Sequence, residues 1–202
     1  MNVDEESERS LVEALRGGDA GAFDRLYEAY RPRLFSFLLR LARRRDVAED
    51  LIDETWLRLV SHAGRLRPGT RLGPWLFTVA RNLYWSYCRS RMVEDEHAGQ
   101  LIGLWPAGLT LRSPLDEAVG HELERRIERA LASLPVRQRE VMLLVAVEEL
   151  TPAEAAAVCG ISPVALRQRL SRARVMLAAA LEAQDAHGSA SKESKEQSDD
   201  GR

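Results

Sequence analysis

Residues 151–174, TPAEAAAVCGISPVALRQRLSRAR, have the pattern of a helix-turn-helix, and this stretch decides the fold of the C-terminal part of the chain. Thr151 precedes Glu154 by three positions, which is the spacing of a capping box at a helix start. Gly160 suits the left-handed position that ends a helix, and Pro163 suits the first position of the next one. Two short helices joined by such a turn form the motif that many proteins use to bind the DNA major groove.

The second helix of this motif has an apolar face and a basic face. Leu166, Leu170 and Ala173 recur at helical spacing with Leu177, so we expect them to face the protein core. An arginine on the other face can pair with guanine and a glutamine with adenine. A solvated, arginine-rich helix face is the alternative, and the helix-turn-helix spacing favours DNA. The candidate duplex-binding residues are Arg167, Gln168, Arg169, Ser171, Arg172 and Arg174.

The charge of the chain is nearly balanced overall but uneven along the sequence. The 202 residues include 29 basic and 31 acidic side chains, for a formal net charge of −2. Residues 61–92 hold six arginines and no acid, and residues 161–180 hold four arginines and no acid. Residues 93–124, by contrast, hold one arginine and seven acids. An acidic chain therefore contains two compact basic segments, and both are candidates for nucleic-acid contact.

The first basic segment is rich in aromatic residues as well as arginine. A loop, SHAGRLRPGTRLGP, leads into the helical sequence WLFTVARNLYWSYCRSR, and residues 61–92 contain five of the twelve aromatic residues of the chain. Arginines neutralise phosphates and aromatic rings stack on unpaired bases, so this composition favours single-stranded DNA. Core packing is the favoured role for Trp75 and Phe77, whereas for Tyr84 and Trp85 core packing and base contact both stay open.

The periodicity and the capping signals predict an all-α protein with two small helical domains joined by a flexible linker, the C-terminal one containing the helix-turn-helix. We expect a helix start at Asp46, a break or kink near Pro32, and helix rather than strand over 141–147. The expected domains are 8–91, a linker over 92–112, 113–183, and a disordered tail over 184–202. The expected helices span 8–16, 20–44, 46–61, 73–91, 114–133, 136–148, 152–159 and 163–183.

The sequence also argues against several classes of protein. No run approaches the roughly 18 apolar residues of a membrane span, and the acidic N-terminus is unlike a signal peptide, so a cytoplasmic protein is expected. Cys88 and Cys159 are the two cysteines, with no CxxC pair, so neither a disulfide scaffold nor a metal site is expected, and no cofactor. The four histidines are scattered and no catalytic motif is present, which argues against an enzyme.

Five stretches, taken in order, resemble the signatures of one family. They are AFDRLYEAY (22–30), AEDLIDETWLRL (48–59), PWLFTVARNLYWSYCRSR (74–91), LPVRQREVMLL (134–144) and the helix-turn-helix. Together they resemble the extracytoplasmic-function (ECF, group 4) branch of the sigma-70 family of bacterial sigma factors. The resemblance covers about residues 8–183, and the two domains would be sigma regions 2 and 4.

The resemblance implies a function in promoter-specific transcription initiation. Core RNA polymerase would be the partner, through the clamp helices of its largest subunit and through its flap, together with promoter DNA and an anti-sigma factor. The helix-turn-helix would contact the −35 element. The implied contacts of the −10 element are Arg65, Arg67, Arg71, Asn82, Tyr84, Trp85 and Arg89. The implied polymerase contacts are Asp50, Leu51, Asp53, Glu54 and Trp56.

Two other function classes remain alternatives at this point. A helix-turn-helix regulator that acts without forming a holoenzyme would bind a duplex site without polymerase. An enzyme would need a catalytic cluster, for which the sequence gives no motif. The sigma-factor hypothesis instead predicts binding without covalent chemistry: an unstacked base is trapped, and the contacts offset a few kcal/mol of unstacking.

Overall fold

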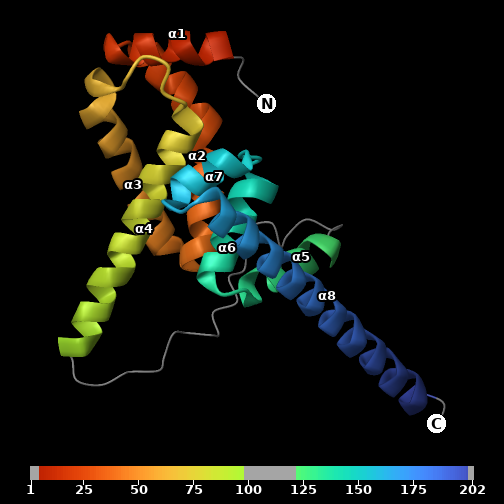
Figure 1. Cartoon of the computed structure of the whole chain (residues 1–202). Helices are drawn as coiled ribbons and strands as arrows, with labels where there is room; N and C mark the ends of the chain where they lie inside the picture. Colours follow the sequence, from red (N-terminus) through yellow and green to blue (C-terminus); the bar gives the residue numbers. More distant parts are fainter. Residues whose placement is uncertain (1–4, 98–121, 200–202) are drawn as a thin grey trace.

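The computed structural model describes residues 5–97 and 122–199, and within them the regular structure is helical, with no strand, as the sequence predicted. The helices form two lobes (Figure 1). The N-terminal lobe comprises α1 (Glu5–Arg16), α2 (Ala20–Ala42), α3 (Arg45–His62), a 3-10 turn η1 (Ala63–Arg65) and α4 (Leu72–His97). The C-terminal lobe comprises α5 (Glu122–Ser133), α6 (Val136–Met142), a π-helical turn η3 (Leu143–Val147), α7 (Pro152–Cys159) and α8 (Pro163–Asp199).

The N-terminal lobe is held together by α2, α3 and α4, which contact one another along their apolar faces. Phe37 of α2 and Phe77 of α4 are both fully buried, with ring centroids 5.3 Å apart at a near-perpendicular angle. Such edge-to-face pairs add to the free energy of burying the two rings. These contacts fix α4, which carries the aromatic basic segment, against the two other helices.

Two predicted features of α2 and α3 are wrong. The predicted break near Pro32 is absent, because Pro32 lies inside α2, which runs from Ala20 to Ala42; a kink at this proline stays a prediction. Helix α3 begins at Arg45, and its N-cap residue Arg44 makes no side-chain capping bond. Asp46 is therefore not the cap but lies in the first helical turn, where it forms an ion pair with Arg44.

The helix-turn-helix forms as the sequence predicted. Thr151 and Glu154 form both halves of a capping box, with the Glu154 amide 3.3 Å from the Thr151 hydroxyl and the Thr151 amide 2.9 Å from the Glu154 carboxylate. Gly160 ends α7 with φ of 62°, in the left-handed region where glycine is favoured. The preceding run 141–147 is helical, but its second part is the π-helical turn η3.

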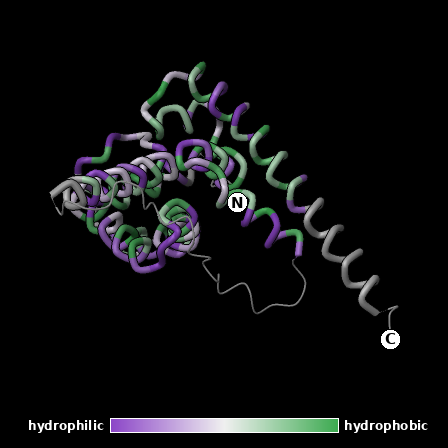
Figure 2. Tube along the Cα trace, turned by 90° about the horizontal axis from the view of Figure 1, so that it is seen from below, coloured by the Kyte–Doolittle hydropathy of each residue, from purple (hydrophilic) through white to green (hydrophobic). Residues whose placement is uncertain are grey.

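Helices α4 and α8 are both longer than predicted. Helix α4 continues to His97 and α8 continues to Asp199, beyond the helix ends expected at 91 and 183. Figure 2 shows hydrophilic and hydrophobic residues interspersed along the helices. The predicted linker beyond 97 and the helix start at Ser113 lie outside the described residues.

The two lobes contact each other directly. Helix α7 packs against α4, and α6 packs against α2 (Figure 1). The sequence predicted two lobes and a linker but gave no indication of this contact. Because α4 is one of the two elements with a predicted DNA-binding surface, the contact bears directly on function.

Candidate nucleic-acid and polymerase interfaces

The predicted recognition helix α8 has a buried face and an exposed face as expected. Leu166, Leu170 and Ala173 are at most 7% exposed. Arg167, Gln168, Ser171 and Arg172 are exposed and line one shallow hollow of the surface. The Arg172 Nε donates to the Gln168 carbonyl oxygen at 3.3 Å, one turn earlier on the same helix. The four side chains therefore form a continuous polar surface on α8, which we call the α8 surface.

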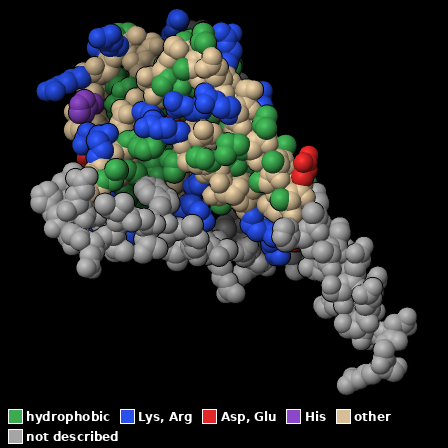
Figure 3. Space-filling model, turned by 60° about the horizontal axis from the view of Figure 1, so that its bottom comes forward, with side chains coloured by type: hydrophobic (Ala, Val, Ile, Leu, Met, Phe, Trp, Pro, Cys, Tyr) green, Lys and Arg blue, Asp and Glu red, His purple; other side chains and the backbone are tan. Residues whose placement is uncertain are grey.

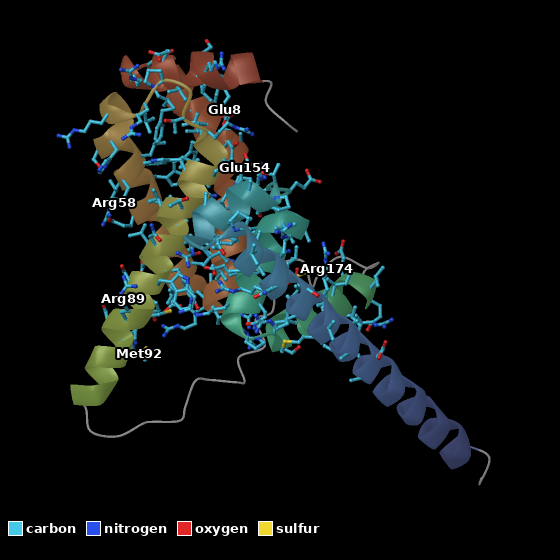
Figure 4. All side chains as sticks on the ribbon, viewed as in Figure 1. Glu8, Arg58, Arg89, Met92, Glu154 and Arg174 are labelled. Atoms are coloured by element: carbon cyan, nitrogen blue, oxygen red, sulfur yellow. The ribbon has the colours of Figure 1, made fainter. Side chains whose placement is uncertain are left out.

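Arg169 and Arg174 lie outside the α8 surface. Arg174 is exposed further along the helix, as Figure 4 shows. Arg169 is only 19% exposed and turns toward the protein, with its Nη1 4.0 Å from the Glu140 Oε2. Sequence reasoning grouped Arg169 with the DNA contacts, and the structure instead places its guanidinium beside a buried carboxylate.

The arginines before α4 fall into two classes. Arg65 and Arg67 are exposed. Arg71, by contrast, lies between two carboxylates: its Nε is 2.9 Å from the Glu8 Oε2 and its Nη2 is 3.2 Å from the Glu154 Oε1. Glu8 belongs to α1 and Glu154 to α7, so the two acids come from different lobes (Figure 4). Arg71 is thus a bridge between the lobes in this structure.

The predicted base-contacting residues of α4 also differ in exposure. Asn82 and Arg89 are exposed. Tyr84 is 2% exposed, and its hydroxyl donates to the Leu41 carbonyl oxygen at 3.3 Å, so it is a core residue rather than a base contact. Burial raises the pKa of this hydroxyl above its usual range. Trp85 is half-buried, and its Nε1 donates to the Glu140 Oε1 at 2.8 Å.

Burial differs along the apolar positions of α4. Trp75, Val79 and Leu83 are half-buried. The fully buried positions are Leu72, Leu76, Phe77, Ala80, Tyr84 and Cys88. Phe77 is a core residue, which is the role the sequence favoured for it.

The candidate polymerase surface lies on α3. Asp50 and Asp53 are exposed, and Glu54 is half-exposed with an ion pair to Arg58 one turn later, at 2.8 Å. Leu51 and Trp56 are only 8% and 6% exposed. The side chains of Leu51 and Trp56 therefore lie in the core of the N-terminal lobe and pack α3 against it.

The structure adds two residues that sequence reasoning missed on α3. Leu57 is 64% exposed and Val60 is 60% exposed, which is unusual for such apolar side chains. They follow Asp53 by four and seven positions, so all three lie on one side of the helix. That spacing was present in the sequence and identifies an exposed surface of acidic and apolar side chains, which we call the α3 surface.

Ion pairs between arginine and glutamate side chains join the two lobes. Four pairs each join an arginine of the N-terminal lobe to a glutamate of the C-terminal lobe: Arg33 with Glu148 (2.9 Å), Arg40 with Glu128 (2.6 Å), Arg71 with Glu154 (3.2 Å) and Arg81 with Glu140 (2.8 Å). No local sequence signal links partners 59 to 115 residues apart, so sequence reasoning missed these pairs. In the third and fourth pairs, the arginine comes from the basic segment 61–92.

One face of the described residues is rich in basic side chains. On the face that Figure 3 shows, Lys and Arg side chains lie among apolar ones, and few acidic side chains are visible. No group of three or more metal-ligating side chains occurs in the part of the chain that the structure describes. Within that same part, every helix is too short or too polar to cross a bilayer.

Comparison with known families gives the two lobes separate matches. Residues 26–93 match sigma-70 region 2, and residues 124–177 match sigma-70 region 4. The ECF RNA polymerase sigma factor EcfG of Rhodopseudomonas palustris (strain TIE-1) is 36% identical over 150 residues, covering 74% of this chain and 80% of that protein. The chain belongs to the ECF sigma factors of the sigma-70 family. The RNA polymerase sigma factor CarQ of Myxococcus xanthus is 35% identical to this sigma factor over 161 residues, 80% of this chain and 90% of that protein.

Solved structures resemble this sigma factor along most of its length. The sigma factor RpoE from Bartonella quintana, in complex with the anti-sigma factor NepR, aligns with a TM-score of 0.64 and 28% identity. The alignment covers 79% of this chain and 96% of that one. CnrH, in complex with the cytosolic domain of CnrY, has a TM-score of 0.63 at 24% identity, covers 87% of this chain and 97% of that one, and supports the fold alone.

Proposed function

We propose that this sigma factor directs initiation at its promoters by three separate surfaces: α8 for the −35 element, the segment 61–92 for the −10 element, and the α3 surface for core RNA polymerase. The observation that carries the proposal is the exposed, acid-free α8 surface in the lobe that matches sigma-70 region 4. Each surface is made of exposed side chains whose chemistry suits its partner.

The α8 surface supports contact with duplex DNA. Arg172 and Arg167 supply planar donors that fit guanine edges or phosphates, and Gln168 fits adenine. The helix presents these residues on the side opposite Leu166 and Leu170, so the lobe can hold α8 in a groove without exposing its core. Arg174, one turn beyond, has the exposure and charge of a phosphate contact.

The segment 61–92 supports contact with an unpaired strand. Arg65, Arg67, Asn82 and Arg89 are exposed and cover the loop and one side of α4. Trp85 is a half-buried aromatic residue of α4 three positions after Asn82, as Trp75 and Tyr87 are half-buried elsewhere on the helix, whereas Tyr84 is in the core. Stacking of a base on Trp85, together with phosphate contacts from the arginines, would stabilise a melted −10 element.

The α3 surface supports docking on core polymerase. Asp50, Asp53 and Glu54 supply negative charge, and Leu57 and Val60 supply apolar area on the same side of the helix. Acidic side chains favour a basic partner such as the clamp helices and increase the association rate, while the apolar side chains contribute affinity.

The proposal also covers partners, location and chemistry. The related RpoE structure contains the anti-sigma factor NepR, and we propose an anti-sigma factor for this chain too. The flap of core polymerase would hold the C-terminal lobe. The protein would act in the cytoplasm, without a cofactor and without catalysing a reaction itself, since binding energy alone drives recognition and melting.

Reconstituted transcription tests the proposal. Core polymerase with the purified sigma factor is incubated with a library of promoter fragments, and the transcripts are sequenced. Promoter-dependent transcripts that need the sigma factor support the proposal. A protein that binds a duplex site tightly by itself and yields no transcript with core polymerase would instead be a helix-turn-helix regulator.

A charge-reversal variant tests the α3 surface in the same assay. Asp53→Arg with Glu54→Arg is expected to abolish co-purification with core polymerase, because like charges would then face the clamp helices. Asp24→Arg with Glu28→Arg on α2 is a control with the same change in charge. Unchanged affinity of the α3 variant for core polymerase would remove Asp53 and Glu54 from the interface.

A further inference from the structure

The loop between η1 and α4 has a defined backbone conformation. It comprises residues 66–71, and we call it the 66–71 loop. The Thr70 amide donates to the Arg67 carbonyl oxygen at 3.0 Å, and the Thr70 hydroxyl donates to the same oxygen at 2.7 Å. Pro68 and Gly69 form the middle of this turn, and Gly69 has a φ of 76°. A proline followed by a glycine with positive φ is the pattern of a type II turn, so few backbone conformations are open to the loop.

Both ends of the 66–71 loop are attached to the core of the N-terminal lobe. Leu66 is 5% exposed, and Leu72, which follows the loop, is 1% exposed. A Cβ at Gly73 would lie 2.9 Å from the Tyr30 hydroxyl oxygen, so the first turn of α4 lies directly against α2. The exposed part of the loop is thus held between two fixed points.

Glu8 of α1 binds the point where the loop becomes α4. Its Oε1 accepts a hydrogen bond from the Leu72 amide at 2.8 Å, and its Oε2 lies 2.9 Å from the Arg71 Nε. Leu72 is the first residue of α4, so its amide has no partner within the helix, and a carboxylate is favoured at this end of the helix dipole. Glu8 is only 8% exposed. The contact is therefore buried, and it joins residues 64 positions apart.

Helix α1 is itself docked on the lobe. Val12 and Leu15 are 0% and 4% exposed, and they follow Glu8 by four and seven positions, so the three side chains lie on one side of the helix. Helix α1 contacts η1 and α2, and Figure 1 shows it lying beside the loop that joins α3 to α4. The packing of Val12 and Leu15 therefore fixes the position of the Glu8 carboxylate.

We propose that Glu8 is a positioning residue for recognition of the −10 element. It acts through the backbone, because its bond to the Leu72 amide fixes where the 66–71 loop enters α4. The loop then meets an unpaired base with its conformation already set, and less conformational entropy is lost on binding. A loop that cannot shift also cannot adapt to a base of the wrong shape, so Glu8 sharpens the choice of base.

This inference rests on the proposed function of segment 61–92 as the contact of the −10 element, and it adds a residue from outside that segment. A merely structural role of Glu8 makes a different prediction. Loss of α1 docking would lower the stability of the lobe and weaken all of its contacts together. A positioning role predicts that the loss is confined to the choice of base.

Three variants of the full chain separate these roles. Glu8→Ala removes both contacts of the carboxylate. Glu8→Gln keeps an oxygen that can accept from the Leu72 amide but has no charge to pair with Arg71. Glu13→Ala is the control, because Glu13 is an exposed residue of the same helix, paired with Arg16 at 3.0 Å, and its loss changes the charge equally. Urea unfolding and co-purification with core polymerase are measured for each variant.

Two further measurements report on the loop and on the choice of base. Hydrogen exchange followed by mass spectrometry is measured on the free sigma factor over residues 66–76. Holoenzyme made with each variant then selects from single-stranded oligonucleotides of random sequence, and the selected strands are sequenced. For Glu8→Ala we expect exchange about threefold to tenfold faster, as one hydrogen bond is lost. We also expect its preference at the most selective base to fall by about threefold to tenfold.

The other variants and readouts should stay close to the native values. Glu8→Gln should keep most of the protection and of the base preference, and Glu13→Ala should keep all of both. Co-purification with core polymerase should be the same for all three variants, because the α3 surface is unaltered.

Each contrary result has its own meaning. Unchanged exchange in Glu8→Ala would show that Glu8 does not hold the loop. Faster exchange with an unchanged base preference would show that the loop's conformation does not decide the choice of base. Equal losses in Glu8→Ala and Glu8→Gln would show that the bond to Leu72 is not the positioning contact. Each of these overturns the inference while native holoenzyme still selects bases, whereas a native holoenzyme that selects no base would contradict the proposed function itself.

Discussion

The two acid-free basic segments, 61–92 and 161–180, have similar compositions but different surroundings in the folded chain. In 161–180, Arg167, Arg172 and Arg174 are exposed. In 61–92, Arg71 and Arg81 form ion pairs with glutamates of the other lobe, and of these two only Arg81 is largely buried, while Arg65, Arg67 and Arg89 are exposed. A run of arginines without acids therefore shows where charge is concentrated in the sequence, and the fold decides which charges are available to a ligand.

The difference arises from the partners of each helix. Helix α8 packs with α5, α6 and α7 on one side and leaves the opposite side open. Helix α4 contacts α2 and α3 on one side and α7 on another, so less of its surface remains for a ligand. Substitutions in α4 and α8 test whether α8 has the more accessible surface of the two.

The largest expected effect separates two adjacent residues of α4. Tyr84→Ala should lower the free energy of unfolding by about 3–5 kcal/mol, because it removes a buried ring and leaves a cavity. Trp85→Ala should lower it by clearly less, because Trp85 is half-buried and lies at the contact between lobes. Urea unfolding followed by circular dichroism measures both. Equal losses would mean that both rings belong to one core.

The next effect concerns the α8 surface. Arg172→Ala should weaken promoter binding by the holoenzyme by about 1–3 kcal/mol at a single −35 position, and should leave stability unchanged. Competition binding with promoters mutated one base pair at a time measures the position. A uniform loss on every promoter would assign Arg172 to a phosphate instead of a base.

A smaller effect is expected at two glycines, one in the turn before α8 and one in the loop before α4. Gly160, before α8, and Gly69, before α4, have φ of 62° and 76°, and a Cβ on either would meet no atom within 4 Å. Alanine at each position should therefore reduce stability by about 1–2 kcal/mol through backbone strain alone. Thermal unfolding of the two variants tests this equality. A much larger loss at Gly160 would show that the turn tolerates no adjustment of α8.

The smallest effect is a lack of reaction at the two cysteines, Cys88 of α4 and Cys159 of α7. Burial raises the pKa of both thiols, that of Cys159 to about 12. At pH 8 both should stay protonated and react slowly with a thiol reagent, and denaturant should expose two reactive thiols. Because the folded form keeps its protons longer than the unfolded one, stability should fall as pH rises above about 8.5. Fast reaction of Cys88 alone would show that α4 opens locally.

Sequence patterns predicted the parts of this fold that depend on nearby residues. The capping box at Thr151 and the left-handed turn at Gly160 involve atoms within a few positions of each other, and both formed as expected. The apolar face of α8 was also predicted, because Leu166, Leu170 and Ala173 repeat at the helical period.

Sequence patterns did not predict which side chains are buried or paired where this depends on packing between distant segments. The sequence left Tyr84 and Trp85 open between core packing and base contact, since aromatic rings occur on several sides of α4 and only tertiary contacts select the inner ones. Leu51 and Trp56 were named as polymerase contacts from the family resemblance, which does not show that both side chains are buried. The pairing of Arg33 with Glu148, 115 positions apart, has no local signature.

The ion pairs between the lobes have a further consequence for how the protein behaves in the cell. When a hydrophobic contact separates, it leaves an apolar patch that promotes aggregation. Arg33, Arg40, Glu128 and Glu148, in contrast, become hydrated as their pairs part. Disruption of these ion pairs would therefore expose charged side chains rather than an apolar patch.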